Sequence, residues 1–382
     1  MQNNTTHLET KMDYQKIVQG VLDRAVENGT ECGCQAALYI NGELVVNACS
    51  GWTDWSKTKK VDENTIFPVY STGKAMSSTL LHRLVEMGKV SYDTRIADFW
   101  PEFGCNGKED MRVWHVLAYR SALWSIPEIE NANFGETADK NDGLLADFNE
   151  MCNRIAKAPL CDIYGGNQKY HARTYGWLTG GIACHVMNTD DYPALFRKIV
   201  AEPAGMDRFF YGISPDENNA ATLVRGLDGS TCSEYGVTKM NDPKFRQCCN
   251  PATCTMSNAL SLARHYSALD TYSLLSKETL ENAVNLKWRA ENDPIPCVRG
   301  RWELFGLGYV LSGPVDDLTR IFGHGGLGGS EALLDRKLHY AIGITRNCFA
   351  EPNVLTEYYS AINFKNRDWP DPMEVPDSIK EK

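Results

Sequence analysis

Segments that predict β-strands lie at both ends of this chain, and a long stretch that predicts helices separates them. Near the N-terminus, Asn41-Gly42 joins two β-rich runs, QAALYI and ELVVNACSG, which is a strong signal for a β-hairpin. Near the C-terminus, Gly-rich turns separate LFGLGYVL, RIFGHG, EALLD and HYAIGITR. Because a strand needs a partner strand, we expect the two ends to pair in one sheet and the middle to form a second lobe.

Apolar residues at helical spacing predict the helices of this arrangement. The predicted segments are 12–29, 75–88, 112–119, 174–187, 258–269 and 353–364. The fold class is therefore α+β and two-lobed. We expect an α/β lobe of residues 12–74 plus 256–366, a helical lobe of residues 75–255, and tails at 1–11 and 367–382. A functional site is expected in the cleft between the lobes.

Composition excludes several classes of protein. The 382 residues carry 39 Lys+Arg against 49 Asp+Glu, a net charge of −10, which argues against a nucleic-acid partner. No apolar run is long enough to span a membrane, and the polar N-terminus does not resemble a secretory signal, so we expect a cytoplasmic protein.

The thirteen cysteines show no Cys-x-x-Cys pair and are expected to be free, mostly buried thiols. No metal or other cofactor is expected, because the eight histidines are dispersed and His-Glu-x-x-His is absent.

Ser71 and Lys74 are the first candidate pair for catalysis. They lie three residues apart at the start of a predicted helix, so both face the same side. A serine hydroxyl needs a neighbouring base to become a nucleophile, and a desolvated lysine can serve as one. Taken alone, the same spacing is more typical of a serine N-cap followed by an exposed lysine.

Tyr170 is the second candidate, at the end of a Gly-containing loop before the segment TYGWLTGGIACHVM. A phenol titrates near ~10, so it can act as a base at neutral pH only if nearby cations lower its pKa. Lys74 could supply that charge. A half-buried structural tyrosine is the competing interpretation.

The third candidate is the segment from Gly323 to Gly328, which matches G-x-G-x-x-G. We reject a dinucleotide site, because the match lies near the C-terminus and another predicted strand follows it. Glycines here would instead let a strand approach a ligand closely, or would only form a turn.

Together the three motifs resemble the serine β-lactamases and penicillin-binding proteins of class C type. The similarity is strongest to the β-lactamase-like esterases, the family VIII carboxylesterases. In those enzymes the tyrosine motif reads Tyr-His-Ala, as at Tyr170–Ala172, and the last motif reads His-Gly-Gly, as at His324–Gly326. The resemblance covers most of residues 14–365 and implies an antiparallel sheet flanked by helices plus a helical lobe.

The resemblance also implies a role for each matched residue. Ser71 would form an acyl-enzyme, with Lys74 and Tyr170 as general base and proton shuttle. The backbone N–H groups of Ser71 and Leu327 would form the oxyanion hole. The substrate would contact four further residues, Ala172, His324, Gly325 and Gly326.

Two departures from the class C β-lactamases bear on substrate. Ala172 occupies the place of an asparagine that binds the acyl-amide side chain, and His324 replaces a lysine. We therefore expect a serine hydrolase that cleaves a small ester or amide. A β-lactamase or D-alanyl-D-alanine carboxypeptidase is the first alternative, and a catalytically silent binding protein of the same fold is the second. The acyl group, the alcohol and the oligomeric state are left open.

Overall fold

The computed structural model describes most of the chain. The described residues are 13–127, 145–289, 297–298, 301–302, 304–314 and 316–364. The tails expected at 1–11 and 367–382 lie outside them.

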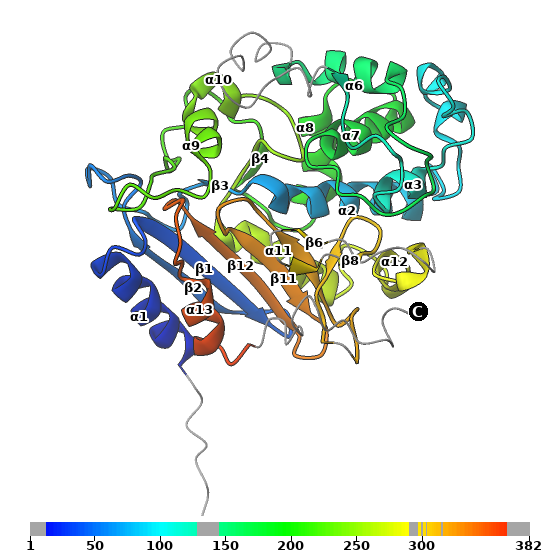
Figure 1. Ribbon diagram of the computed structural model, residues 1–382. Helices are drawn as coiled ribbons and strands as arrows, with labels where there is room; N and C mark the ends of the chain where they lie inside the picture. The colour runs from blue at the N-terminus through cyan, green and yellow to red at the C-terminus, as the bar shows by residue number, and fades with distance from the viewer. Residues whose placement is uncertain are drawn as a thin grey trace, which may run out of the picture.

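A seven-stranded antiparallel sheet joins the two ends of the chain, as predicted (Figure 1). Its spatial order is β2-β1-β12-β11-β10-β9-β8. The central pairing is between the N-terminal and C-terminal parts, with Ala36 of β1 opposite Ile344 of β12. The strand bounds are β1 Gly33–Ile40, β2 Glu43–Gly51, β8 Leu304–Phe305, β9 Val310–Leu311, β10 Ile321–Gly325, β11 Glu331–Asp335 and β12 Tyr340–Arg346.

Helices cover both faces of this sheet. On one face, α1 (Tyr14–Glu27) packs against β2 and against α13 (Leu355–Ala361), and on the other, α11 (Ala259–Asp270) packs against β1, β11 and β12. The buried side of α1 consists of Val18, Val21, Leu22 and Ala25. This apolar stripe recurs every three or four residues, which is why the sequence predicts the helix.

The middle of the chain is mainly helical and lies along one edge of the sheet layer (Figure 1). Its α-helices are α2 Gly73–Glu86, α3 Val113–Leu117, α6 Phe148–Lys157, α7 Thr174–Met187, α8 Tyr192–Phe196, α9 Glu234–Asn241 and α10 Pro243–Arg246, and α12 Lys277–Ala283 follows α11. Shorter helical turns are η1 Tyr70–Thr72, η2 Ile96–Asp98, η3 Pro101–Phe103, η5 Arg197–Ala201 and η6 Leu286–Trp288.

One expectation for the middle segment is wrong. We expected only helices and irregular structure there, but β4 (Phe209–Tyr211) pairs with β5 (Thr255–Ser257), which pairs with β3 (Phe67–Pro68). These strands have two or three residues, too few to show an alternating pattern in the sequence. A further short pair, β6 (Cys297–Val298) and β7 (Arg301–Trp302), stands apart from both sheets.

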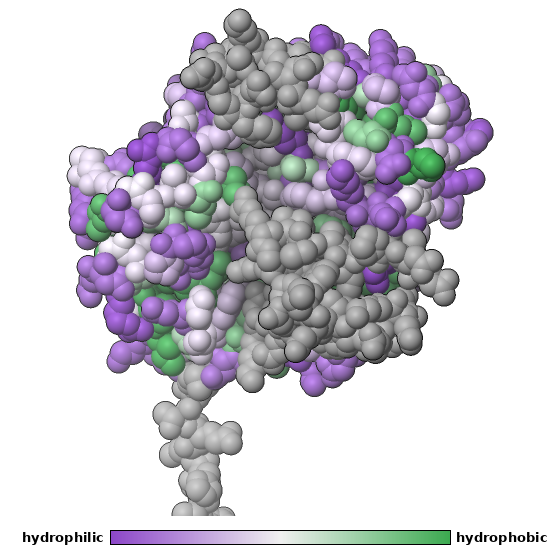
Figure 2. Space-filling view, viewed as in Figure 1, coloured by the Kyte–Doolittle hydropathy of each residue, from purple (hydrophilic) through white to green (hydrophobic). Residues whose placement is uncertain are grey.

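On the face seen in Figure 2, hydrophilic residues predominate over the described surface, and the hydrophobic ones form small separate patches. None of the helices among the described residues is both long and apolar enough to cross a bilayer.

Candidate active site

Ser71 lies in η1, one tight turn before α2 begins, rather than in the first turn of the helix itself as we expected. The turn is held from two sides. The Val69 N–H donates to the C=O of Thr255 at 2.9 Å, and the Tyr70 hydroxyl donates to the C=O of Gly236 at 2.6 Å. Tyr70 has φ +45°, a conformation that costs a non-glycine residue about 1–3 kcal/mol. The surrounding contacts therefore hold Ser71 in a strained and well-defined turn.

Lys74 is fully buried and reaches Ser71. Its Nζ donates to Ser71 Oγ at 2.8 Å and to the C=O of Ala252 at 2.8 Å. Taking an isolated ammonium out of water is costly, so a lysine here requires such partners. The bond to Ala252 fixes the amine beside the hydroxyl, which is the geometry that a general base for Ser71 needs.

Tyr170 lies against the same amine. Lys74 Nζ is 4.8 Å from the centroid of the Tyr170 ring, and the His324 ring centroid is 6.0 Å from that of Tyr170. Phe305 stacks on Tyr170 at 6.0 Å. The structure therefore brings Ser71 and Lys74 together with Tyr170 and His324, from three distant parts of the chain.

The loop between β10 and β11 is seated on the Ser71 turn. A Cβ at Gly326 would lie 2.2 Å from the Val69 carbonyl oxygen, so only glycine permits this approach. Within the loop, the Gly326 N–H donates to the C=O of Ser330 at 2.7 Å and the Gly329 N–H to the C=O of Gly326 at 3.1 Å. Leu327 is thus the second residue of a turn lying on the Ser71 turn, as an oxyanion-hole amide would have to be.

The remaining predicted contact residues differ in exposure. His324 is only 4% exposed, and its Nδ1 lies 2.7 Å from the carbonyl oxygen of Gly325. Gly325 and Gly326 are half-buried, whereas Ala172 is exposed two residues after Tyr170. His324 therefore belongs to the floor of the site more than to its rim.

The residues that support Tyr170 from behind belong to no motif of the sequence. His171 is fully buried, with Nε2 2.6 Å from Ser121 Oγ and Nδ1 2.5 Å from the carbonyl oxygen of Lys169. Ser121 belongs to a segment in which Tyr119 and Ala122 both have positive φ. The only signal for these contacts was the place of His171 beside Tyr170.

Polar residues of α2 fix the helix that carries Lys74. Ser77 Oγ lies 2.7 Å from the Tyr192 hydroxyl, Ser78 Oγ lies 2.7 Å from that of Tyr175, and Thr79 Oγ1 lies 2.9 Å from His265 Nε2. Eleven residues of α2 are buried, so these bonds satisfy side chains that have no access to water.

Four buried histidines have pKa values well below the usual value, chiefly because burial disfavours the charged form. The pKa is lowered to about 4 for His82, His115 and His171 and to about 3 for His265. For His171, the positive charges of Lys74 and Lys169 also lower it. His171 is therefore a neutral support for the site rather than a cation facing a substrate.

We expect these histidines to make folding strongly sensitive to acid. Between pH 6.5 and about 4 the unfolded chain binds protons that the folded one excludes, so the stability present above pH 6.5 is lost as the pH falls. Each histidine contributes on the order of 2–3 kcal/mol at pH 4.5. Glu31 opposes this, because burial raises its pKa to about 7 and folding gains stability there as the pH falls.

The four histidines lower the free energy of unfolding as the pH falls, and Glu31 alone raises it. The sum is a predicted net loss of several kcal/mol in the free energy of unfolding from pH 7 to pH 4.5. Urea denaturation at the two pH values measures it. His265→Gln should reduce the net loss by roughly a third, because Glu31 offsets about one of the four histidine contributions. An unchanged free energy of unfolding across this range would contradict the predicted histidine effect.

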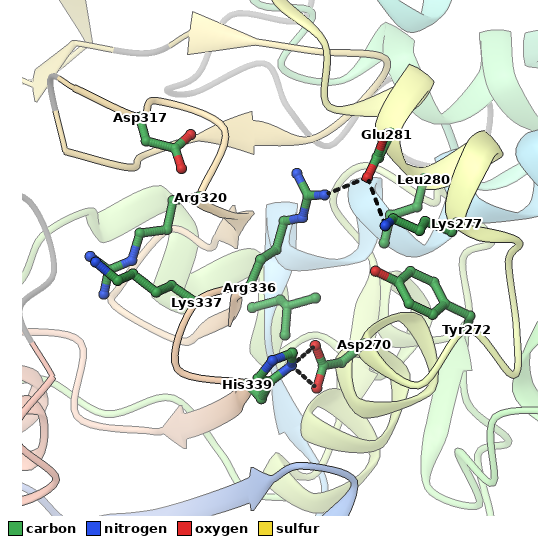
Figure 3. A pocket seen from close by; sticks show the side chains of 11 residues that line it. Asp270, Tyr272, Lys277, Leu280, Glu281, Asp317, Arg320, Arg336, Lys337 and His339 are labelled. Carbon is green, nitrogen blue, oxygen red and sulfur yellow. Dashed lines mark hydrogen bonds and ion pairs between the residues drawn. The ribbon is translucent and has the colours of Figure 1, made fainter.

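A cavity of about 310 Å³ lies at the opposite end of β10 from the site (Figure 3). Two ion pairs join residues that line it: Arg336 with Glu281 at 3.3 Å, and His339 with Asp270 at 3.0 Å. No group of three or more potential metal ligands occurs among the described residues.

Comparisons with known proteins agree with the fold. The sequence profile of the β-lactamase family matches residues 19–362. The esterase/β-lactamase LipL of Mycobacterium tuberculosis is 27% identical over 362 residues, which cover 85% of this chain and 79% of LipL.

Two solved structures have the same fold. A family VIII carboxylesterase superposes with a TM-score of 0.77 at 24% identity, over 92% of this chain and 97% of that one. A penicillin-binding protein homologue from Caulobacter crescentus superposes with a TM-score of 0.74 at 24% identity, over 92% of this chain and 96% of that one. The fold and the family profile define a serine hydrolase. The chain belongs to the β-lactamase family, which confirms the resemblance of its motifs.

Proposed function

We propose that this protein hydrolyses small esters through an acyl-enzyme on Ser71. The observation that carries the proposal is the 2.8 Å contact between Lys74 Nζ and Ser71 Oγ, made beside Tyr170 and beneath the Leu327 turn. The pairing of a hydroxyl with a buried amine supplies a nucleophile and its base without a metal. The similarity to LipL, which is named an esterase, also supports an ester as the substrate.

The reaction proceeds in two halves. The reacting form is the one in which Lys74 has lost its proton. In it the Ser71 O–H gives its proton to the Lys74 amine as Oγ attacks the ester carbonyl, and the N–H groups of Ser71 and Leu327 hold the resulting oxyanion. Collapse breaks the bond to the alkoxide leaving group, which takes the proton through Tyr170. Water then attacks the acyl-serine with the proton moving the other way, which releases the acid and restores Ser71.

The contact residues favour esters over β-lactams. Ala172 offers no amide to an acylamino side chain, and the buried His324, at 4% exposure, stands where a lysine would hold a carboxylate. We propose that Ala172, Gly325 and Gly326 border the acyl group and His324 the floor below it. Because LipL is named for both activities, a β-lactamase is the second candidate. The complete set Ser71, Lys74 and Tyr170 argues against a silent binding protein.

We also propose that the site lies between an α/β lobe (12–74 with 256–366) and a helical lobe (75–255), because its residues come from both parts. The free state of all twelve cysteines among the described residues supports a reducing, cytoplasmic compartment. The thirteenth, Cys297, has no described side chain.

A substrate panel combined with active-site labelling tests the proposal. We expect p-nitrophenyl acetate or butyrate to be turned over with kcat/KM at least tenfold above that for nitrocefin. A fluorophosphonate should add once per chain, on the peptide that contains Ser71. Nitrocefin turnover equal to ester turnover would make the β-lactamase assignment preferable, and failure of the probe to label folded protein would favour the binding protein.

A further inference from the structure

Arg346, at the end of β12, is a buried arginine outside the reaction. It is 2% exposed, and its guanidinium donates in three directions. Nε donates to Glu31 Oε1 at 2.6 Å, one terminal nitrogen donates to the C=O of Gly328, and the other to the C=O of Ala350 at 2.9 Å. The rigid fork of an arginine can hold three acceptors at fixed angles, which a lysine cannot do.

Glu31 holds the guanidinium in place. It is fully buried in the link between α1 and β1, and its Oε1 also accepts the Val354 N–H at 3.2 Å. Its own N–H donates to the C=O of Ala25 at 2.8 Å. A buried charge needs an opposite charge nearby, so Glu31 and Arg346 require each other.

Gly328, whose C=O accepts from Arg346, directly follows Leu327. Gly328 and Gly329 have φ +89° and +97°, and a Cβ at Gly328 would lie 1.8 Å from a ring carbon of Phe349. The loop therefore lies flat on Phe349 and is held through its backbone. Phe349 also packs against Tyr70, the residue before Ser71, at 5.8 Å between ring centroids. The residues next to the two amides of the proposed oxyanion hole, Tyr70 and Gly328, thus both contact the segment 346–350.

We propose that Arg346, oriented by Glu31, is a positioning residue that holds the Leu327 amide in the geometry for binding the oxyanion. This rests on the proposed function. An oxyanion hole lowers the barrier only when its donors are already oriented, since reorientation during the reaction would take back the gain. Arg346 does not touch the substrate; it fixes the C=O of Gly328, one residue beyond the donor, and with it the turn from Gly326 to Ser330.

Arg346→Lys is the test variant, and Arg320→Lys is its matched control. Arg320 makes a similar ion pair in the same sheet, with 3.0 and 2.7 Å to the two oxygens of Asp335, at the end of β10 away from the site. The measurements are kcat and KM for a p-nitrophenyl ester, the affinity for phenylboronic acid, and Tm. The boronate adduct on Ser71 places an oxygen in the oxyanion hole, so its affinity reports on the Leu327 amide.

For Arg346→Lys we expect kcat and boronate affinity each to fall at least tenfold, with KM within twofold of wild type. Arg320→Lys should keep both within twofold, with a smaller loss of Tm because the Arg320 side chain is 22% exposed. Equal kcat and equal boronate affinity in the two variants would overturn the proposal.

Should Arg346→Lys fail to fold, Glu31→Gln gives the second measurement. It keeps the arginine but removes its charged partner. A parallel fall in kcat and boronate affinity is expected, and wild-type values for both would overturn the proposal.

The Ser71→Ala variant separates this inference from the function it rests on. Ester turnover by wild type no greater than that by Ser71→Ala would refute the proposed function. Normal wild-type turnover with Arg346→Lys equal to Arg320→Lys would refute only the role of Arg346.

Discussion

Replacing Ser71 with alanine is expected to lower kcat for ester hydrolysis by at least about 10⁴-fold, because no acyl-enzyme can form without Oγ. Stability should not suffer. Ser71 is half-buried, and its loss leaves the Lys74 amine still bonded to the C=O of Ala252 at 2.8 Å. We therefore expect Tm to stay within about 2 °C of wild type or to rise, as is common when an active-site group is removed. Initial rates and thermal unfolding measure the two quantities.

Ser77 is the matched control for Ser71, six residues further along the chain and 1% exposed. Its Oγ lies 2.8 Å from Thr179 Oγ1 and 2.7 Å from the Tyr192 hydroxyl. Ser77→Ala should therefore cost about 1–3 kcal/mol of stability and leave kcat within twofold. If Ser71→Ala kept more than a tenth of wild-type activity, another residue would have to be the nucleophile.

Replacing Lys74 with methionine should lower kcat by about 10²–10⁴-fold, the range typical of a lost general base. Methionine fills nearly the same volume, so the shape of the site is kept while the amine beside Ser71 Oγ disappears. Fluorophosphonate labelling of Ser71 should slow to a similar extent, since the same proton transfer activates the hydroxyl. Stopped-flow or single-turnover kinetics would measure both steps.

Lys108 is the matched control for Lys74. It is also fully buried, and its Nζ donates to the C=O of Ala158 at 2.6 Å. Lys108→Met removes a buried amine of the same kind from another part of the helical region, and kcat should stay within twofold. Similar losses of activity in the two variants would mean that buried lysines act through general stability, and Lys74 would lose its role as base.

The local structure was largely predictable because its signals are short in range. The Asn41-Gly42 turn predicted the hairpin of β1 and β2, and apolar spacing predicted α1, α2, α7 and α11. The strand β4 escaped prediction, because three residues between irregular segments show no period. We expected Ser71 in the first turn of α2, but it lies in a separate tight turn that depends on contacts with Thr255 and Gly236, far away in the sequence.

The candidate site was predictable as a set of residues. Ser71, Lys74 and Tyr170 could be named because each stands in a motif with a chemical reason for its spacing. The residues that hold these side chains in place could not be predicted in this way. Ser121 behind His171 and Arg346 behind Gly328 are single polar residues without a motif, and each acquires its contact only when segments 50 and 18 residues apart are brought together.

What the sequence by itself determined is the set of chemical groups and the elements that carry them, because helical period, turn residues and motif spacing are properties of neighbouring residues. Only the tertiary structure decided that the Lys74 amine is buried and lies 2.8 Å from the Ser71 hydroxyl, and that Gly326 packs against the Val69 carbonyl. Burial and close approach are collective properties of the packed chain. The electrostatics of a catalytic site depend on both, and no local pattern contains them.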